Sequence, residues 1–453
     1  MDHNSSRFDE SKVTLELDQI QSIILRSRPI PYFGTVVLVE IKDKEAGKTL
    51  IKNLLPEVTT SVNWHNSNNG AATIAISYKG FIALGLPKET LDSFPNEFKA
   101  GMAGRHEKLT DYGENHPDNW QYPYKDNNIH ILVNIIADSE EKWKNKLKSV
   151  RDKFEDISGY TIIAMGDFSA TEKVTNAFGF RDGLSQPEVD GSGVDIPPGY
   201  GRAVKAGEFI IGYPGEAGNI DESIKPLAFS KNGSFVALRK YRSNVHLFNQ
   251  FLHKNGKTPE ERELLAAKLF GRWRSGVPLA LSPKADDPEL ATDRTKINNF
   301  DFKDDDYGRK TPLSCHMRRM YPRDTKMAVM SDLNMHRIIR RGVAYGGVPG
   351  DDFLEDDGKE RGLYFLGISA KAMQTMEFLQ SEWGNTGNFI NHGDEKDPVI
   401  GVVKEDEDGV FTLPKEEGGR VRIHGVKTFN TLVGGEYLFI PGINGLKWIL
   451  DQE

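Results

Sequence analysis

Two histidines of this sequence stand among arginines, a combination that suits a particular cofactor. His316 lies in SCHMRRMYPR and His336 lies in LNMHRIIRRGVAYG. A haem iron takes one axial imidazole and keeps its opposite face open, and its two propionates attract cations such as arginine. Both segments supply these groups, although an isolated histidine is more often structural than a metal ligand. From residue types alone, haem is therefore one hypothesis and a structural histidine is the other.

A second segment, AFGFRDGLSQPEVDG at residues 177–191, places Arg181 and Asp182 between glycines. Glycine permits backbone angles that other residues avoid and lets another surface come close, and Pro187 then restricts the exit. The pattern predicts a turn that holds one or two charged side chains against another part of the molecule. The alternative is a purely structural turn, in which Asp182 caps its own backbone.

Composition excludes several other classes of function. The 453 residues carry a formal net charge of −8, which argues against a nucleic-acid partner. The one cysteine, Cys315, rules out an internal disulfide and a cysteine-based metal site. There is no HExxH motif, and the run NHGDEKD is compatible with a hard-metal site but more typical of a solvated loop. No apolar run approaches the roughly 20 residues of a membrane span. No signal peptide is evident, which predicts a cytoplasmic protein unless a leader has been removed.

The elements that must position these residues form two similar series. Strands are predicted at 20–26, 34–41, 72–77 and 129–137, and helices at 42–58 and 139–157, with Ser139 as an N-cap. This order is typical of a ferredoxin-like unit. After a polar, glycine-rich passage at 188–207, strands are predicted at 208–214, 233–241, 337–346 and 362–370, with helices at 244–256, 261–273 and 371–383. We therefore expect an N-terminal half at 1–200 and a C-terminal half at 201–453.

Several motifs together resemble one known family. GFRDG resembles the GxxDG motif of the dye-decolourising peroxidases, a group of haem peroxidases. SCHMRRMYPRD is similar to the family's proximal histidine segment, HRIIRRGVAYG to its distal arginine segment, and RGLYFLG and DPVIG to its closing strands. The resemblance covers about residues 14–401, and the long loops are most similar to the larger fungal and bacterial forms.

The resemblance implies a fold, a cofactor and an activity. The fold would be α+β, with two ferredoxin-like halves, each an antiparallel sheet with flanking helices, as in a dimeric α+β barrel. Haem b would lie in the second half, and the 177–191 turn would place Asp182 over it. The enzyme would reduce hydrogen peroxide through a ferryl porphyrin radical and oxidise phenols or dyes. A haem carrier or sensor is the alternative function, and a homo-oligomer is left open.

Three residues would carry the chemistry. His316 would be the iron ligand, with His336 as its rival. Asp182 would move the proton of hydrogen peroxide, and Arg340 would stabilise the charge that develops as the O–O bond breaks. Arg341 is the rival of Arg340, and alternation along a strand allows only one of the two to face the haem.

Four further residues are assigned to the cofactor pocket. Arg337 would pair with a propionate, and Leu363 and Phe365 would keep the distal side narrow and dry. Glu360 is the expected acceptor for the His316 Nδ1–H, with Asp397 as its rival.

Bulky donors would not enter so tight a pocket and would give up electrons at the surface. Trp383 and Tyr345 are the candidate relays, although a single aromatic residue at such a place is more often packing.

Overall fold

The N-terminal half is one antiparallel sheet covered by two helices. The computed structural model describes residues 13–62, 64, 70–154, 159–170, 174–194, 197, 201–326, 332–350, 353–415 and 417–452. The strands of this half are ordered β4-β1-β3-β2. Its elements are β1 (Tyr32–Ile41), α2 (Lys44–Leu54), β2 (Ala71–Ser77), β3 (Ile131–Ala137), α6 (Glu140–Asp152) and β4 (Tyr160–Ala170). The chain order and strand order together are those of the ferredoxin-like unit expected from the sequence.

The C-terminal half repeats this order with different connections. Its strands are ordered β11-β5-β8-β6, and β7 also pairs with β8. The first, third and last of its strands in chain order are long, whereas the second is split into β6 and β7. The strands are β5 (Ser234–Ser243), β6 (Ile339–Arg340), β7 (Val343–Tyr345), β8 (Gly362–Ser369) and β11 (Asn430–Ile440). The main helices are α8 (Val245–Asn255), α9 (Pro259–Phe270), α11 (His316–Met320) and α12 (Ala372–Phe378).

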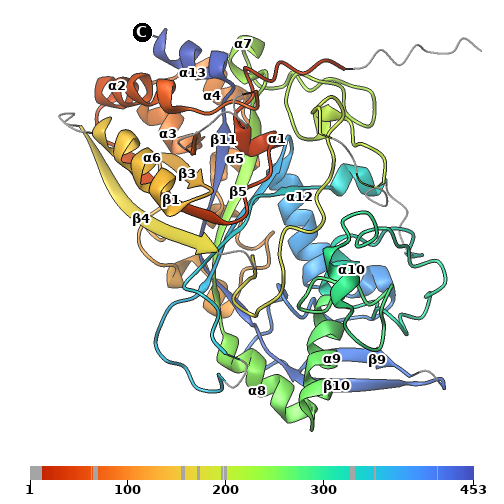
Figure 1. The fold of residues 1–453 in the computed structure, drawn as a ribbon. Coiled ribbons are helices and arrows are strands. Elements are labelled where there is room, and N and C mark those ends of the chain that lie inside the picture. Colours follow the sequence, from red (N-terminus) through yellow and green to blue (C-terminus); the bar gives the residue numbers. More distant parts are fainter. Residues whose placement is uncertain are drawn as a thin grey trace, which may run out of the picture.

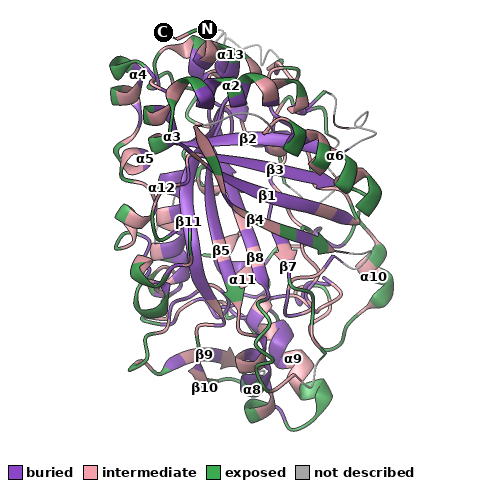
Figure 2. Ribbon diagram, turned by 90° about the vertical axis from the view of Figure 1, so that its left-hand side faces the viewer, coloured by how far each residue is buried: buried purple, intermediate pink, exposed green. Residues whose placement is uncertain are grey.

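The two halves join edge to edge. Strand β11 pairs with β2 at Leu438↔Ser77 and Phe439↔Ile76, which makes one continuous sheet of nine strands. At the opposite edges β4 lies against β7, and a β-carbon at Gly166 would come within 2.0 Å of the Tyr364 hydroxyl. Figure 2 shows the mostly buried strands of both halves side by side. The predicted fold class, two ferredoxin-like halves in an α+β barrel arrangement, is confirmed.

Smaller elements complete the molecule. The helices α8 and α9 and the hairpin of β9 and β10 lie together at the end remote from α2 and α13 (Figure 1). Within the described ranges, no helix combines the length and apolar character that crossing a bilayer requires. The remaining elements are α1 (Ser22–Leu25), α3 (Tyr78–Ala83), α4 (Lys88–Ser93), α5 (Asn96–Ala100), α7 (Leu227–Ser230), α10 (Pro288–Thr292), β9 (Gly409–Pro414), β10 (Arg420–Val426) and α13 (Ile443–Leu450).

Local chemistry explains why several elements begin where they do. The Ser139 side chain accepts a hydrogen bond from the Lys142 N–H, so the predicted N-cap of α6 is confirmed. Asp43 caps α2 in the same way, through the Ala46 N–H. Thr258 and Glu261 form a reciprocal capping box at the start of α9.

Two predicted strands are wrong, and a third is broken. Residues 20–26 contain the short helix α1, because the Gln21 amide bonds the backbone of Ile74 and Pro441 and turns the chain there. Residues 208–214 begin in a 3-10 turn at Ala206–Glu208. The Ile210 N–H donates to the Ala206 carbonyl and not to a neighbouring strand. A buried apolar run satisfies either conformation, so the run alone did not discriminate. The 337–346 strand is interrupted between β6 and β7.

The predicted boundary near residue 200 falls between β4 and β5. It remains a prediction, because the continuous sheet does not mark any point in that passage as a division.

Candidate active site

A cavity of about 280 Å³ lies in the C-terminal half, at the point where the crossover from the first half passes over it. Apolar side chains from several elements line it, including Phe270, Ile338, Met376, Leu379 and Ile400. Arginines line it as well, among them Arg272, Arg323, Arg337 and Arg340. The cavity therefore offers an apolar interior with several cations, as an amphipathic anionic ligand requires.

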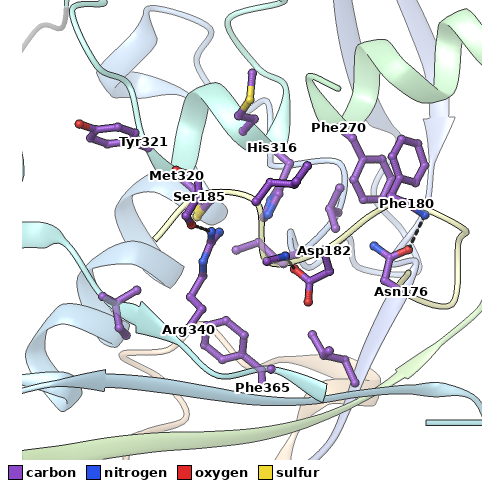
Figure 3. Close-up of a pocket in the computed structure, with 18 of the residues that line it drawn as sticks. Asn176, Phe180, Asp182, Ser185, Phe270, His316, Met320, Tyr321, Arg340 and Phe365 are labelled. Carbon is purple, nitrogen blue, oxygen red and sulfur yellow. Dashed lines mark hydrogen bonds between the residues drawn. The ribbon is translucent and has the colours of Figure 1, made fainter. Parts of the chain in front are cut away.

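Three of the predicted site residues meet in this cavity, although they come from three separate segments. Asp182 belongs to the crossover, His316 begins α11, and Arg340 ends β6. Figure 3 shows the three side chains around the same space. Leu363 and Phe365 of β8 and Arg337 also line the cavity, as expected.

The turn that carries Asp182 is built as the glycine pattern suggested. Gly183 has a φ of 80°, in the left-handed region, and its missing side chain leaves room for the Arg28 guanidinium 3.2 Å from the ideal Cβ position. The Gly183 N–H donates to Asp182 Oδ1 at 2.7 Å. Arg28 Nη2 donates to Asp182 Oδ2 at 3.0 Å. The carboxylate is therefore held from both sides, while 40% of its side chain remains exposed to the open cavity.

Electrostatics keep Asp182 ionised. Burial raises the pKa of its carboxyl, but the charges of Arg28 and Arg340 and the two hydrogen bonds lower it more, so the pKa lies below its ordinary value. Arg28 was not singled out in the sequence. It lies in the segment RSRPI far from the motif, and no local pattern connects it with Asp182.

Arg340 is fixed to the crossover by paired contacts. Its N–H donates to Gln186 Oε1 at 2.9 Å, and Gln186 Nε2 donates back to the Arg340 carbonyl at 3.0 Å. Its guanidinium donates to the Ser185 carbonyl. Arg341 points the other way, with Nε donating to the Ile23 carbonyl at 2.9 Å. Arg340, and not Arg341, thus faces the cavity.

His316 presents a ring nitrogen to the cavity because its other nitrogen is occupied. Nδ1 lies 3.0 Å from Asp397 Oδ2, and Asp397 is fully buried. The Val399 and Ile400 N–H groups donate to Asp397 Oδ1 at 2.7 and 2.9 Å. Burial raises the pKa of the Asp397 carboxyl, but His316, the Arg319 charge and the Ile400 N–H lower it more, so the pKa lies below its ordinary value. An anionic acceptor therefore stands behind the imidazole.

The structure corrects the expected partner of His316. Glu360 accepts hydrogen bonds from Gln121 at 2.6 Å and from Tyr345 at 3.0 Å, and it does not line the cavity. The rival residue Asp397 is the acceptor. Sequence order could not decide between them, since both carboxylates follow His316 in long polar segments.

His336 also lines the cavity. Its ring stacks on that of Phe378, with 4.3 Å between the ring centroids, and burial lowers the pKa of its imidazole. Trp383 and Tyr345, the expected surface relays, are 4% and 9% exposed. Both side chains therefore lie mostly below the surface, and their role as relays remains a prediction.

Arginines near α11 extend the cationic lining. Arg337 lies 3.9 Å from the Tyr321 ring centroid, and Arg323 lies 3.9 Å from that of Phe300. Burial lowers the pKa of Arg323 to about 10, which leaves it charged at neutral pH. Arg272 and Arg323 were not predicted individually, although the basic cluster RMYPR was a signal for Arg323. In the part of the chain that the structure describes, no group of three or more metal-ligating side chains occurs, which includes the NHGDEKD run.

Comparison with known proteins agrees with this fold. Residues 20–167 match the family model described as the DyP dimeric alpha+beta barrel domain. A dye-decolorizing peroxidase of Exidia glandulosa is 30% identical over 464 residues, which covers 96% of this chain and 87% of the relative.

Two solved structures of dye-decolorizing peroxidases superpose on nearly the whole chain. One, a complex with 2,6-dimethoxyphenol, has a TM-score of 0.80 and 26% identity, and covers 96% of this chain and 99% of its own. The other, from work on engineering the heme pocket, has a TM-score of 0.81 and 25% identity, and covers 97% and 100%. The barrel and the extent of these matches lead to one assignment: this chain belongs to the dye-decolourising peroxidase family and is a peroxidase.

Proposed function

We propose that the cavity binds haem b, with which the chain reduces hydrogen peroxide and oxidises small aromatic donors. The observation that carries this proposal is the convergence of His316, Asp182 and Arg340 on one cavity from three separate segments. The donor set fits the group: one imidazole with a free nitrogen, an apolar lining and several arginines. A relative with a heme pocket supports the same cofactor.

His316 would hold the iron through Nε2, because Asp397 occupies Nδ1 and fixes the neutral tautomer. Arg337 would pair with a propionate. Bound haem would supply the iron at which peroxide is cleaved and the oxidising equivalents for the donors. Leu363 and Phe365 would limit the access of water and of bulky molecules to that side.

Asp182 and Arg340 would act on the peroxide itself. The Asp182 carboxylate would accept a proton from one peroxide oxygen and return it to the leaving oxygen, which departs as water. Arg340 would stabilise the negative charge on that oxygen as the bond breaks. Two electrons and two protons from two donor molecules complete the reduction to two water molecules. The relative solved with 2,6-dimethoxyphenol supports phenols as donors.

Three variants test these roles. We expect Asp182→Asn and Arg340→Leu to retain haem but to react with peroxide about 10²–10⁴-fold more slowly. Stopped-flow spectroscopy of the Soret band measures these rates. His316→Ala should lose or misligate haem.

Arg341→Lys is the matched control, because Arg341 is adjacent to Arg340 but faces away from the cavity, and it should react at the wild-type rate. An unchanged rate in Asp182→Asn and Arg340→Leu would refute their roles. Haem binding by the wild type without peroxide-dependent dye oxidation would instead favour a carrier or sensor.

A further inference from the structure

A second and much smaller cavity lies behind the active site, on the side of the N-terminal half. Its volume is about 20 Å³, which is room for about one water molecule or one monatomic ion. Arg26, Arg28 and Arg341 line it, together with Ser22 and several neutral side chains. Arg28 lines both cavities, so a single guanidinium separates this space from Asp182.

The charge around this cavity is unbalanced. Arg26 donates to the carbonyls of Ser61 and Ser192, and Arg341 donates to those of Ile23 and Ile24. Backbone carbonyls satisfy these donors but do not neutralise their charge. Among the residues lining the cavity there is no carboxylate, and only Arg28 forms an ion pair within the described chain.

The wider surroundings do not restore the balance. Asp182 pairs with Arg28, and Glu188 is the carboxylate that interacts with Arg341. Burial and the nearby Arg28 charge lower the pKa of Arg341 to about 9, so it stays protonated at neutral pH. Arg340 also lies within electrostatic range of Arg28. Among the residues that the structure describes, Arg26, Arg28, Arg340 and Arg341 therefore lie near two carboxylates, one of which, Glu188, also interacts with Arg337.

Two hydrogen-bond donors at the cavity also lack partners among the residues that the structure describes. Ser22 is 1% exposed, and its Oγ makes no hydrogen bond to any of them. The Arg28 side chain is 10% exposed, and its Nε has no described partner either. Buried donors are rarely left unpaired, and each such group needs an explanation.

We propose that this cavity is a binding site for a small monovalent anion of the size of chloride. Such an ion would accept hydrogen bonds from Ser22 Oγ and Arg28 Nε and would offset the charge of Arg26 and Arg341. A water molecule could accept the same bonds but would leave the charge unbalanced.

Crystallography of the full-length protein in bromide gives the direct test. Data collected at the bromine absorption edge should show an anomalous peak in the cavity, within contact distance of Arg28, Arg341 and Ser22. Ordered density in the cavity without an anomalous signal would mean that water fills it and would overturn the proposal. The outcome does not depend on the roles proposed for Asp182 and His316.

Variants provide a second test, in solution. Chloride binding, followed by the ³⁵Cl NMR line width with bromide as competitor, should weaken about tenfold in Arg341→Gln and should be largely retained in Arg341→Lys. Ser22→Ala should bind chloride severalfold more weakly.

Ser61→Ala is the matched control, because Ser61 Oγ is also buried and unpartnered but does not line the cavity. It should bind chloride as the wild type does. Equal binding in Ser22→Ala and Ser61→Ala would refute the site, and both substitutions are small enough to preserve folding.

Discussion

The two halves of the barrel share a strand order but differ in the connection between their first and second strands. In the N-terminal half, residues 42–70 connect β1 to β2, and their described part contains helix α2 followed by a 3-10 turn at Leu55–Glu57. In the C-terminal half, residues 244–338 lie between β5 and β6 and contain α8, α9, α10 and α11. Helix α2 of the short connection packs against β1, whereas residues of the long connection, His316 among them, line the large cavity. The same topology thus produces a closed half and an open half.

The open half does not complete its own site. Asp182 reaches the cavity from the crossover, and Arg28, from the segment before β1, holds its carboxylate. Of the three residues proposed to act on iron and peroxide, Arg340 and His316 belong to the C-terminal half. Topology therefore provides the space, whereas the side chains that line it come from both halves.

Breaking the contact between the halves should have the largest effect. Arg239 on β5 and Asp111, in the β2–β3 connection, are both fully buried and form two hydrogen bonds of 3.0 and 2.6 Å. Arg239→Met would leave the Asp111 charge unpaired, so we expect the free energy of unfolding to fall by about 3–5 kcal/mol. Chemical denaturation measures this change.

The double variant Arg239→Met/Asp111→Leu is the control for that experiment. It removes both charges and should recover most of the lost stability. A single variant as stable as the wild type would show that the pair does not hold the halves together.

The next largest effect should come from replacing Asp397, which contacts His316 Nδ1 within the open half. Asp397→Asn would weaken the acceptor at Nδ1, and we expect haem affinity to fall about 10–100-fold, measured by transfer of haem to a scavenger protein. Glu360→Gln is the matched control, because Glu360 lies away from His316, and its haem affinity should equal that of the wild type. Equal loss in both variants would contradict the assignment of Asp397.

The smallest effect should come from replacing Arg28, which reaches the site from the closed N-terminal half. Arg28 lowers the pKa of Asp182, and Asp182 must be ionised to accept a proton. Removing the cation in Arg28→Gln should raise that pKa, so the acid limb of the peroxide reaction should move to higher pH by about one unit. At pH values below the shifted limb the rate should be lower than that of the wild type, and at neutral pH it should be unchanged.

Arg28→Lys keeps a positive charge and should retain most of the wild-type pH profile. Stopped-flow rates across the acid range measure both variants. An acid limb that does not move in Arg28→Gln would mean that the closed half contributes no charge to the chemistry.

Much of the site could be predicted because its signals are local. The glycines around Asp182 permit the turn, and alternation along a strand separates Arg340 from Arg341. Arg28 could not be found in this way, since its role depends on a contact across 154 positions of the chain. Asp397 was a rival of Glu360 for the same reason: its contact with His316 spans 81 positions.

The strand that joins the halves was missed altogether. In β11, Gly434 and Gly435 interrupt the apolar pattern, and the buried Glu436 breaks it further. Tyr124 and Met102 occupy the space where the side chains of those glycines would be. Burial raises the pKa of Glu436 to about 7, as its fully enclosed position requires. Each irregular residue of β11 makes sense only once its distant neighbours are known.

By itself, then, the sequence determined the repeated α+β plan and the residue types at the site, because periodicity, capping and turn chemistry act between near neighbours. Only the tertiary structure decided which carboxylate supports His316, which arginine holds Asp182, and how the two sheets join. Those choices depend on hydrogen bonds and charges between segments that the chain brings together only when it folds.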